Sequence, residues 1–275
     1  LDDEEEYSID VIQPEKIEFK QNSYEDGENS IISFPEFLLL VLDVCTGGEQ
    51  PASHYQPDKL IEKFDALKTY FTAGEFYEKM LYYRLLLDYY TIRRDIKDGQ
   101  GNYSLILKGP KDDNDKLKQY QSMLYVSTEA FYNWLKPYLR KLEQDELHSC
   151  AEMLAFLKKG DNERHSILPA RKDLSYKASG NIRYWFWRLD YYLWEQRSTF
   201  FNEEEQKIVE HYVFRRNRSI EHLHPQDESH NEEWEEEAVH SFGNLAMISQ
   251  SFNSQQSNDH IQIKFARIHE QISNK

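Results

Sequence analysis

Residues 219–226 read Ser-Ile-Glu-His-Leu-His-Pro-Gln, and residues 241–249 read Ser-Phe-Gly-Asn-Leu-Ala-Met-Ile-Ser. The middle of the first run is typical of a short strand, and its proline ends that strand just after the histidines. The second run follows a glycine and predicts another short strand over 244–249. A segment with helical spacing, 261–272, comes last. The C-terminal part of the chain is therefore predicted to fold as strand, strand, helix.

Upstream of this part, residues 31–215 are predicted to form a helical domain. Ser33 is a suitable N-cap, with a proline in the first turn and Glu36 three residues after the cap. Residues 182–194 are the most aromatic stretch of the chain, and aromatic side chains at helical spacing favour a buried core over a base-stacking surface. A long helix is expected from Phe76 through Ile92.

Composition agrees with a mainly α fold, a helical domain followed by a small ββα unit over 216–275. Of the 275 residues 39% are hydrophobic and 14% aromatic, too many large apolar side chains for a disordered chain. The longest apolar run, 37–42, is far short of the roughly 20 residues of a membrane span. Two cysteines make no disulfide framework, and no secretory signal opens the chain. We therefore expect a cytoplasmic protein without a membrane partner.

The net charge of −16 is concentrated in two places. Residues 1–30 hold eleven acids against two lysines and are predicted to be an acidic lead-in or a linker from an upstream domain. Residues 221–237 hold eight acids and no lysine or arginine. In contrast, 158–188 carries eight cations against three acids, so it could contact phosphates or be a solvated basic loop.

The C-terminal motifs resemble a known family. Glu221-His-Leu-His-Pro-Gln, then Phe242-Gly-Asn-Leu, then Asn253-Ser resembles the HNH (His-Me finger) domain of GmrSD-type modification-dependent restriction endonucleases, over roughly residues 215–270. The resemblance implies a ββα-metal nuclease that hydrolyses DNA as the C-terminal part of a larger phage-defence enzyme acting on modified or foreign DNA. It also implies an upstream ParB-like, nucleotide-hydrolysing domain, joined through the helical domain.

The same resemblance assigns roles to individual residues. His222 is the expected general base, which takes a proton from the attacking water. Glu221 and Asn253 are the expected oxygen ligands of one Mg²⁺ or Mn²⁺, which binds the scissile phosphate. Asn244 is expected to hold the imidazole of His222 in its working orientation. Three residues on or near the last helix are expected to contact the DNA backbone: Asn258, Lys264 and Arg267.

Other interpretations stay open at this stage. Many relatives carry Asp where this chain has Glu221, and the longer side chain could displace or weaken the metal. The acidic insert 227–237 could repel DNA, face away from it, or act as a gate. His224, His230 and His240 lie near His222, but the absence of a cysteine partner argues against zinc, and His224 is expected to be structural. The alternative function is a catalytically inactive module for DNA binding or assembly.

Overall fold

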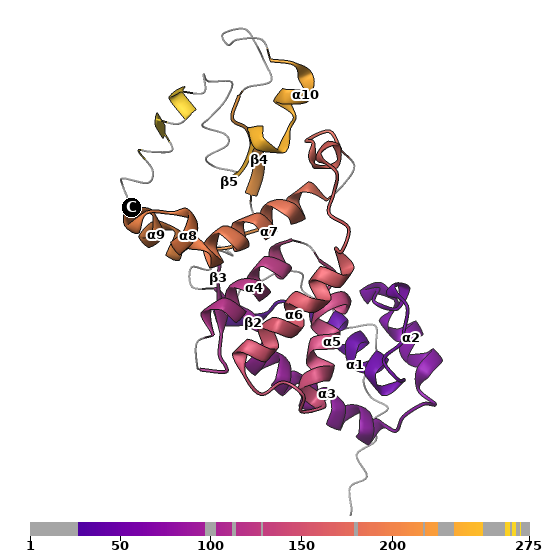
Figure 1. The fold of residues 1–275 in the computed structure, drawn as a ribbon. Coiled ribbons are helices and arrows are strands. Elements are labelled where there is room, and N and C mark those ends of the chain that lie inside the picture. The colour runs from indigo at the N-terminus through magenta and orange to yellow at the C-terminus, as the bar shows by residue number, and fades with distance from the viewer. Residues whose placement is uncertain are drawn as a thin grey trace, which may run out of the picture.

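The computed structural model describes residues 27–96, 103–111, 114–127, 129–178, 181–216, 218–224 and 234–249, and six positions between 262 and 270. This part of the chain is mainly helical with two small antiparallel sheets, which confirms the predicted fold class at that level (Figure 1).

The helices are α1 (Phe34–Cys45), α2 (Leu60–Leu67), α3 (Ala73–Tyr90), α4 (Asp115–Val126), α5 (Phe131–Glu143), α6 (Cys150–Arg164), α7 (Ile182–Glu195), α8 (Arg197–Phe200), α9 (Glu203–Glu210) and α10 (Glu236–Val239). Strands β1 (Gly27–Ser30), β2 (Ile92–Ile96) and β3 (Tyr103–Leu107) form one antiparallel sheet in that order. Strands β4 (Arg218–His222) and β5 (Leu245–Ser249) form the second.

Helix α1 begins where the sequence indicates. The Ser33 hydroxyl accepts from the backbone N–H of Glu36, and the Glu36 carboxylate accepts from the backbone N–H of Ser33. This reciprocal capping satisfies two donors that a helix start leaves open. The helix ends before Gly47 and Gly48, whose φ angles of 105° and 80° suit residues without a Cβ.

The three-stranded sheet differs from expectation in two places. The helix predicted to run through Ile92 ends at Tyr90, because the backbone N–H of Ile92 donates to the buried side chain of Gln121 and strand β2 begins there. Strand β1 occupies the end of the segment predicted as an acidic lead-in, and residues 1–26 lie outside the described residues.

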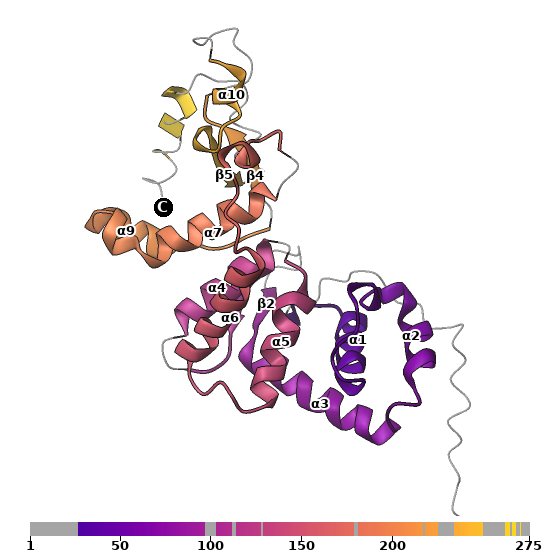
Figure 2. The same ribbon diagram turned by 45° about the vertical axis from the view of Figure 1, so that its right-hand side comes forward.

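Helix α7 belongs to two cores. Trp187, Tyr191 and Trp194 lie in the large core of the helical body, which confirms that 182–194 is a core helix. Ile182 and Phe186, on another face of the same helix, pack with Leu245 of β5 in a small second cluster. In two views the β4–β5 sheet stands above α7, away from α1, α2 and α3 (Figures 1 and 2). The predicted boundary between residues 215 and 216 stays a prediction, and a helix upstream of it covers the small sheet.

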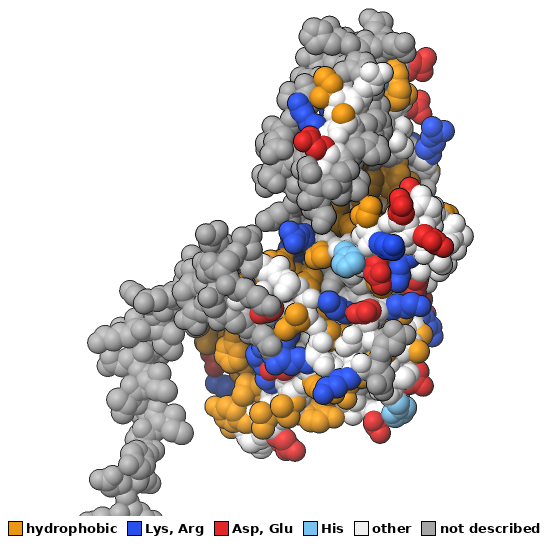
Figure 3. All heavy atoms as spheres, turned by 90° about the vertical axis from the view of Figure 1, so that its left-hand side faces the viewer, with side chains coloured by type: hydrophobic (Ala, Val, Ile, Leu, Met, Phe, Trp, Pro, Cys, Tyr) orange, Lys and Arg blue, Asp and Glu red, His pale blue; other side chains and the backbone are white. Residues whose placement is uncertain are grey.

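One face of α3 is exposed and apolar. Tyr77, Leu81 and Leu85 follow one another at intervals of four residues and are all exposed. Figure 3 shows hydrophobic side chains gathered at the lower end of the helical body, the end where α3 lies in Figure 1. Among the described helices, none is long and apolar enough to cross a membrane.

Candidate functional site

The candidate site lies at the end of strand β4. Strands β4 and β5 pair in antiparallel register, with Glu221 opposite Ala246 and His222 opposite Leu245. His222 is therefore the last paired residue of its strand, and its side chain is buried. The two strands predicted over this part of the sequence are confirmed, and the six described positions between 262 and 270 are helical.

The imidazole of His222 contacts two aromatic rings. Its Nε2 lies 3.1 Å from Nδ1 of His240, which comes directly after α10. The ring of Tyr176 meets it edge-on, with centroids 4.5 Å apart. Tyr176 also donates its backbone N–H to the carbonyl oxygen of His240 at 2.9 Å. The loop before α7 and the segment after α10 therefore converge on one histidine.

The hydrogen bond between the two imidazoles limits their tautomers, because one proton can lie between Nε2 and Nδ1. When Nε2 of His222 donates this proton, Nδ1 of His222 is the basic nitrogen. Burial, and then the positive charges of His240 and Lys264, lower the pKa of His222 to about 4. The imidazole is therefore neutral near pH 7, which is the form that can accept a proton.

Glu221 is paired with a buried lysine. Lys264 Nζ lies 2.7 Å from Oε1 of Glu221 and 2.8 Å from the carbonyl oxygen of His222, and Lys264 is only 2% exposed. The pair joins the described helical residues near the C-terminus to strand β4. Two oxygen atoms thus converge on one cationic group beside His222.

These oxygen atoms are of the kind that Mg²⁺ prefers, so Glu221 fits a divalent metal by its chemistry. The second expected ligand, Asn253, lies outside the described residues, as does Asn258. Among the residues that are described, no group of three or more His, Cys, Asp and Glu side chains could hold a metal ion. The metal and its ligand set remain expectations.

Asn244 binds backbone atoms. Its Oδ1 accepts from the N–H of His224 at 2.8 Å, and its Nδ2 donates to the carbonyl oxygens of His224 and Val239, at 3.2 and 2.8 Å. These bonds tie the end of β4 to the segment that carries His240. Through these backbone bonds Asn244 would position His222 indirectly, and its predicted catalytic role stays a prediction.

The remaining candidate residues are distributed as follows. His224 is buried and stacks on Trp234, with ring centroids 4.2 Å apart, in keeping with a structural residue. Lys264, expected on the DNA backbone, is buried against Glu221. Arg267 is partly exposed on the described part of the last helix, and its DNA contact stays a prediction.

Two contacts of His222 were not predicted from the sequence. His240 was considered only as a zinc ligand, although it directly precedes the Ser-Phe-Gly-Asn run, and that position was the available signal. Tyr176 had no signal, because it comes from a loop 46 positions before His222 and no spacing rule links the two.

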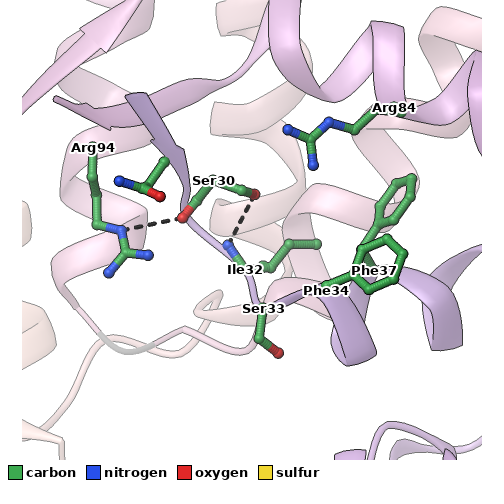
Figure 4. Close-up of a pocket in the computed structure, with 8 residues that line it drawn as sticks. Ser30, Ile32, Ser33, Phe34, Phe37, Arg84 and Arg94 are labelled. Carbon is green, nitrogen blue, oxygen red and sulfur yellow. Dashed lines mark hydrogen bonds between the residues drawn. The ribbon is translucent and has the colours of Figure 1, made fainter. Parts of the chain in front are cut away.

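A separate hollow of about 280 Å³ lies in the helical body, between β1, α1 and α3 (Figure 4). Arg84, Arg94, Phe34 and Phe37 line it, and Arg94 Nε donates to the carbonyl oxygen of Ser30. Arg84 pairs with Asp88 within α3. These bonds are typical of arginines that stabilise the fold. None of the residues around His222 lines the hollow.

A buried histidine with a lowered pKa thus lies beside a carboxylate at the end of a two-stranded antiparallel sheet. Residues 161–274 match the family model described as GmrSD restriction endonucleases, C-terminal domain. This match, over less than half of the chain, confirms the predicted resemblance and indicates a nuclease of the restriction-endonuclease type in that region. No curated protein and no solved structure matches the chain.

Proposed function

We propose that residues 161–274 form a metal-dependent DNA endonuclease of the HNH type, in which His222 is the general base. The observation that carries the proposal is the buried contact between Nε2 of His222 and Nδ1 of His240, within a domain of the GmrSD C-terminal family. This contact provides what a general base needs, a neutral imidazole in a defined orientation.

In the proposed reaction, His222 accepts a proton from water as the water oxygen attacks the scissile phosphorus. His240 holds the imidazole through Nε2, so that Nδ1 of His222 is the nitrogen that takes the proton. When the imidazole becomes positively charged, Nδ1 of His240 can still accept the hydrogen bond from Nε2 if His240 carries its own proton on Nε2. The histidine pair therefore suits both states of the base.

Glu221 and Asn253 are the proposed ligands of Mg²⁺ or Mn²⁺. Such an ion would supply positive charge to the scissile phosphate and to the departing oxygen. In the described structure the Glu221 carboxylate bonds to Lys264, whose ammonium would hold the carboxylate oriented and neutralise part of its charge. The Glu221 side chain reaches Lys264 from strand β4.

The wider setting follows the family. We propose that the nuclease acts in the cytoplasm on modified or foreign DNA and works with an upstream ParB-like, nucleotide-hydrolysing domain. Asn258 and Arg267 are proposed to contact the DNA backbone.

The test is cleavage of supercoiled plasmid by the 275-residue chain in Mg²⁺ or Mn²⁺. We expect nicked or linear DNA from the wild type, and none with EDTA or from the His222→Ala variant, whose folding is checked by circular dichroism. His211→Ala is the matched control, because His211 is exposed at the end of α9, and it should cut like the wild type. Cleavage by His222→Ala would refute the assignment of the base. A folded wild type that binds DNA but cuts under neither ion would favour the inactive binding module.

A further inference from the structure

The basic segment 158–188 contains cations that have side-chain partners and cations that have none among the described residues. Five of its eight cations have acidic or polar partners: Lys158 with Glu195, Lys159 with Glu163, Arg164 with Glu129, Lys177 with Glu236, and Arg188 with Asn162 and Tyr184. Arg183 has a contact of its own. Arg171 and Lys172 are exposed, and no described residue pairs with either of them. Among the described residues, the cations of this segment without a side-chain partner are therefore these two neighbours.

The same loop has an apolar tip. Ile167 is 87% exposed and Leu168 is 76% exposed, the two highest values among the exposed large hydrophobic residues of the described chain. A single exposed Ile or Leu needs no explanation. Two adjacent ones, four residues before two unpaired cations, make a combined apolar and cationic surface, which we call the loop 166–172.

This loop is held in shape at its base. The backbone N–H of Ala170 donates to the Asp173 carboxylate, and the N–H of Asp173 donates to the carbonyl oxygen of Ala170 at 2.8 Å. Four residues beyond Lys172, Tyr176 contacts the rings of His222 and His240. Four residues span at most about 14 Å, so the cations lie within that length of chain from a residue that touches the candidate base.

The acidic charge near the loop is partly neutralised. Lys177 forms an ion pair with Glu236 of α10, which reduces the repulsion that α10 would exert on an approaching phosphate. Glu235 and Glu237 remain exposed on the same short segment. Lys177 therefore offsets one acid of α10 close in sequence to Arg171 and Lys172.

We propose that the loop 166–172 is a duplex-DNA-binding element of this nuclease, in which Arg171 and Lys172 bind backbone phosphates and Ile167 and Leu168 enter the minor groove as an apolar wedge. Apolar side chains that enter the minor groove unstack a base step and kink the duplex. This inference rests on the proposed function for its ligand. The link through Tyr176 to His222 favours DNA over a membrane surface or an apolar protein partner.

Binding is measured separately from cutting, by fluorescence anisotropy of a labelled duplex in EDTA at several salt concentrations. The double variant Arg171→Ala/Lys172→Ala should bind about tenfold more weakly, and the slope of log K against log salt should fall by about 2. Arg171→Lys/Lys172→Arg should restore both. Lys59→Ala, an exposed lysine beside α2, is the control and should bind like the wild type.

The wedge is tested with a duplex that carries 2-aminopurine, whose fluorescence rises when its neighbours unstack. Wild type should raise the fluorescence, and Ile167→Ser/Leu168→Ser should abolish the rise while leaving the salt slope unchanged. Ile61→Ser, at a position 73% exposed on α2, is the matched control. Circular dichroism checks that each variant is folded.

The outcomes separate the two proposals. An Arg171→Ala/Lys172→Ala variant that binds duplex as tightly as wild type, with an unchanged salt slope, would overturn the inference even if the wild type cuts. Binding to vesicles of anionic lipid, lost in the loop variants while duplex binding is unchanged, would overturn it in favour of a membrane surface. Weakened duplex binding in the loop variants would support it even if no cleavage occurs, in which case only the proposed nuclease activity fails.

Discussion

The helical body and the β4–β5 sheet are stabilised in different ways. The body buries many large aromatic side chains, including Tyr83, Tyr138 and Trp187, in one continuous core. The small sheet buries Leu245 against two residues of α7, with Ile220, Phe242 and Met247 packed around them, and polar bonds hold the segments around His222. We therefore expect the body to supply most of the stability, and the polar contacts of the site to open before the body unfolds.

The largest expected effect comes from substituting two neighbouring residues of α7, one in each core. Trp187→Ala removes a ring from the large core and should lower the free energy of unfolding of the whole chain by about 3–5 kcal/mol. Phe186→Ala removes a ring that stacks on Phe242 and should mainly release the β4–β5 sheet, by about 3 kcal/mol. Urea unfolding by circular dichroism reports the first, and hydrogen exchange of β4 and β5 amides reports the second.

If the two variants gave the same shift in one shared transition, the body and the sheet would be a single cooperative unit. The comparison between them would then have no energetic basis.

This division also explains what could be predicted from the sequence. The start of helix α1 could be predicted, because Ser33 and Glu36 cap it locally and such caps are recognisable in a sequence. The start of strand β2 could not be predicted, because the backbone N–H of Ile92 bonds to the side chain of Gln121, which lies 29 positions away. In the site, His222 and Asn244 lie in motifs, whereas Tyr176 and the pairing of Lys264 with Glu221 depend on tertiary contacts between distant segments. Local signals therefore identified the candidate residues His222 and Asn244, whereas the contacts around them could be recognised only in the folded structure.

Acidic pH should open the β4–β5 sheet before it unfolds the helical body. The pKa of His222 lies near 4 in the folded chain, below the ordinary value of 6.5, and burial also lowers the pKa of His240. Between about pH 4 and pH 6.5 the unfolded sheet therefore binds more protons than the folded sheet. The stability that neutral His222 contributes is fully present above about pH 6.5 and is lost as the pH falls toward 4.

Hydrogen exchange at pH 7, 5.5 and 4.5 gives the free energy of opening of β4 and β5. It should fall with pH in the wild type and fall much less in His222→Gln, which does not titrate in this range. An equal loss in both proteins would assign the pH dependence to other groups.

A smaller effect is expected at Asn244. Asn244→Ala removes three hydrogen bonds to the backbone of His224 and Val239 and leaves the buried N–H of His224 without this acceptor. The opening free energy of β4 and β5 should fall by about 1–2 kcal/mol, with the urea midpoint of the body unchanged. Asn244→Asp keeps the acceptor for His224 but loses the donors, so an intermediate value is expected. An effect on the body of equal size would contradict the separation of the two regions.

The smallest expected change isolates the contact between the two histidines. His240→Ala removes the partner of Nε2 of His222 and should lower the cleavage rate about tenfold, since one neutral hydrogen bond contributes roughly 0.5–1.5 kcal/mol. His240→Asn can place a side-chain polar atom near the position of Nδ1, so it should recover most of that rate. The ¹⁵N chemical shifts of His222 report its tautomer without any cleavage. We expect one tautomer in the wild type and in His240→Asn, and a mixture in His240→Ala. An unchanged tautomer and an unchanged rate in His240→Ala would show that this hydrogen bond does not orient His222. The β4–β5 sheet would then lose the observation that supports a catalytic role for it.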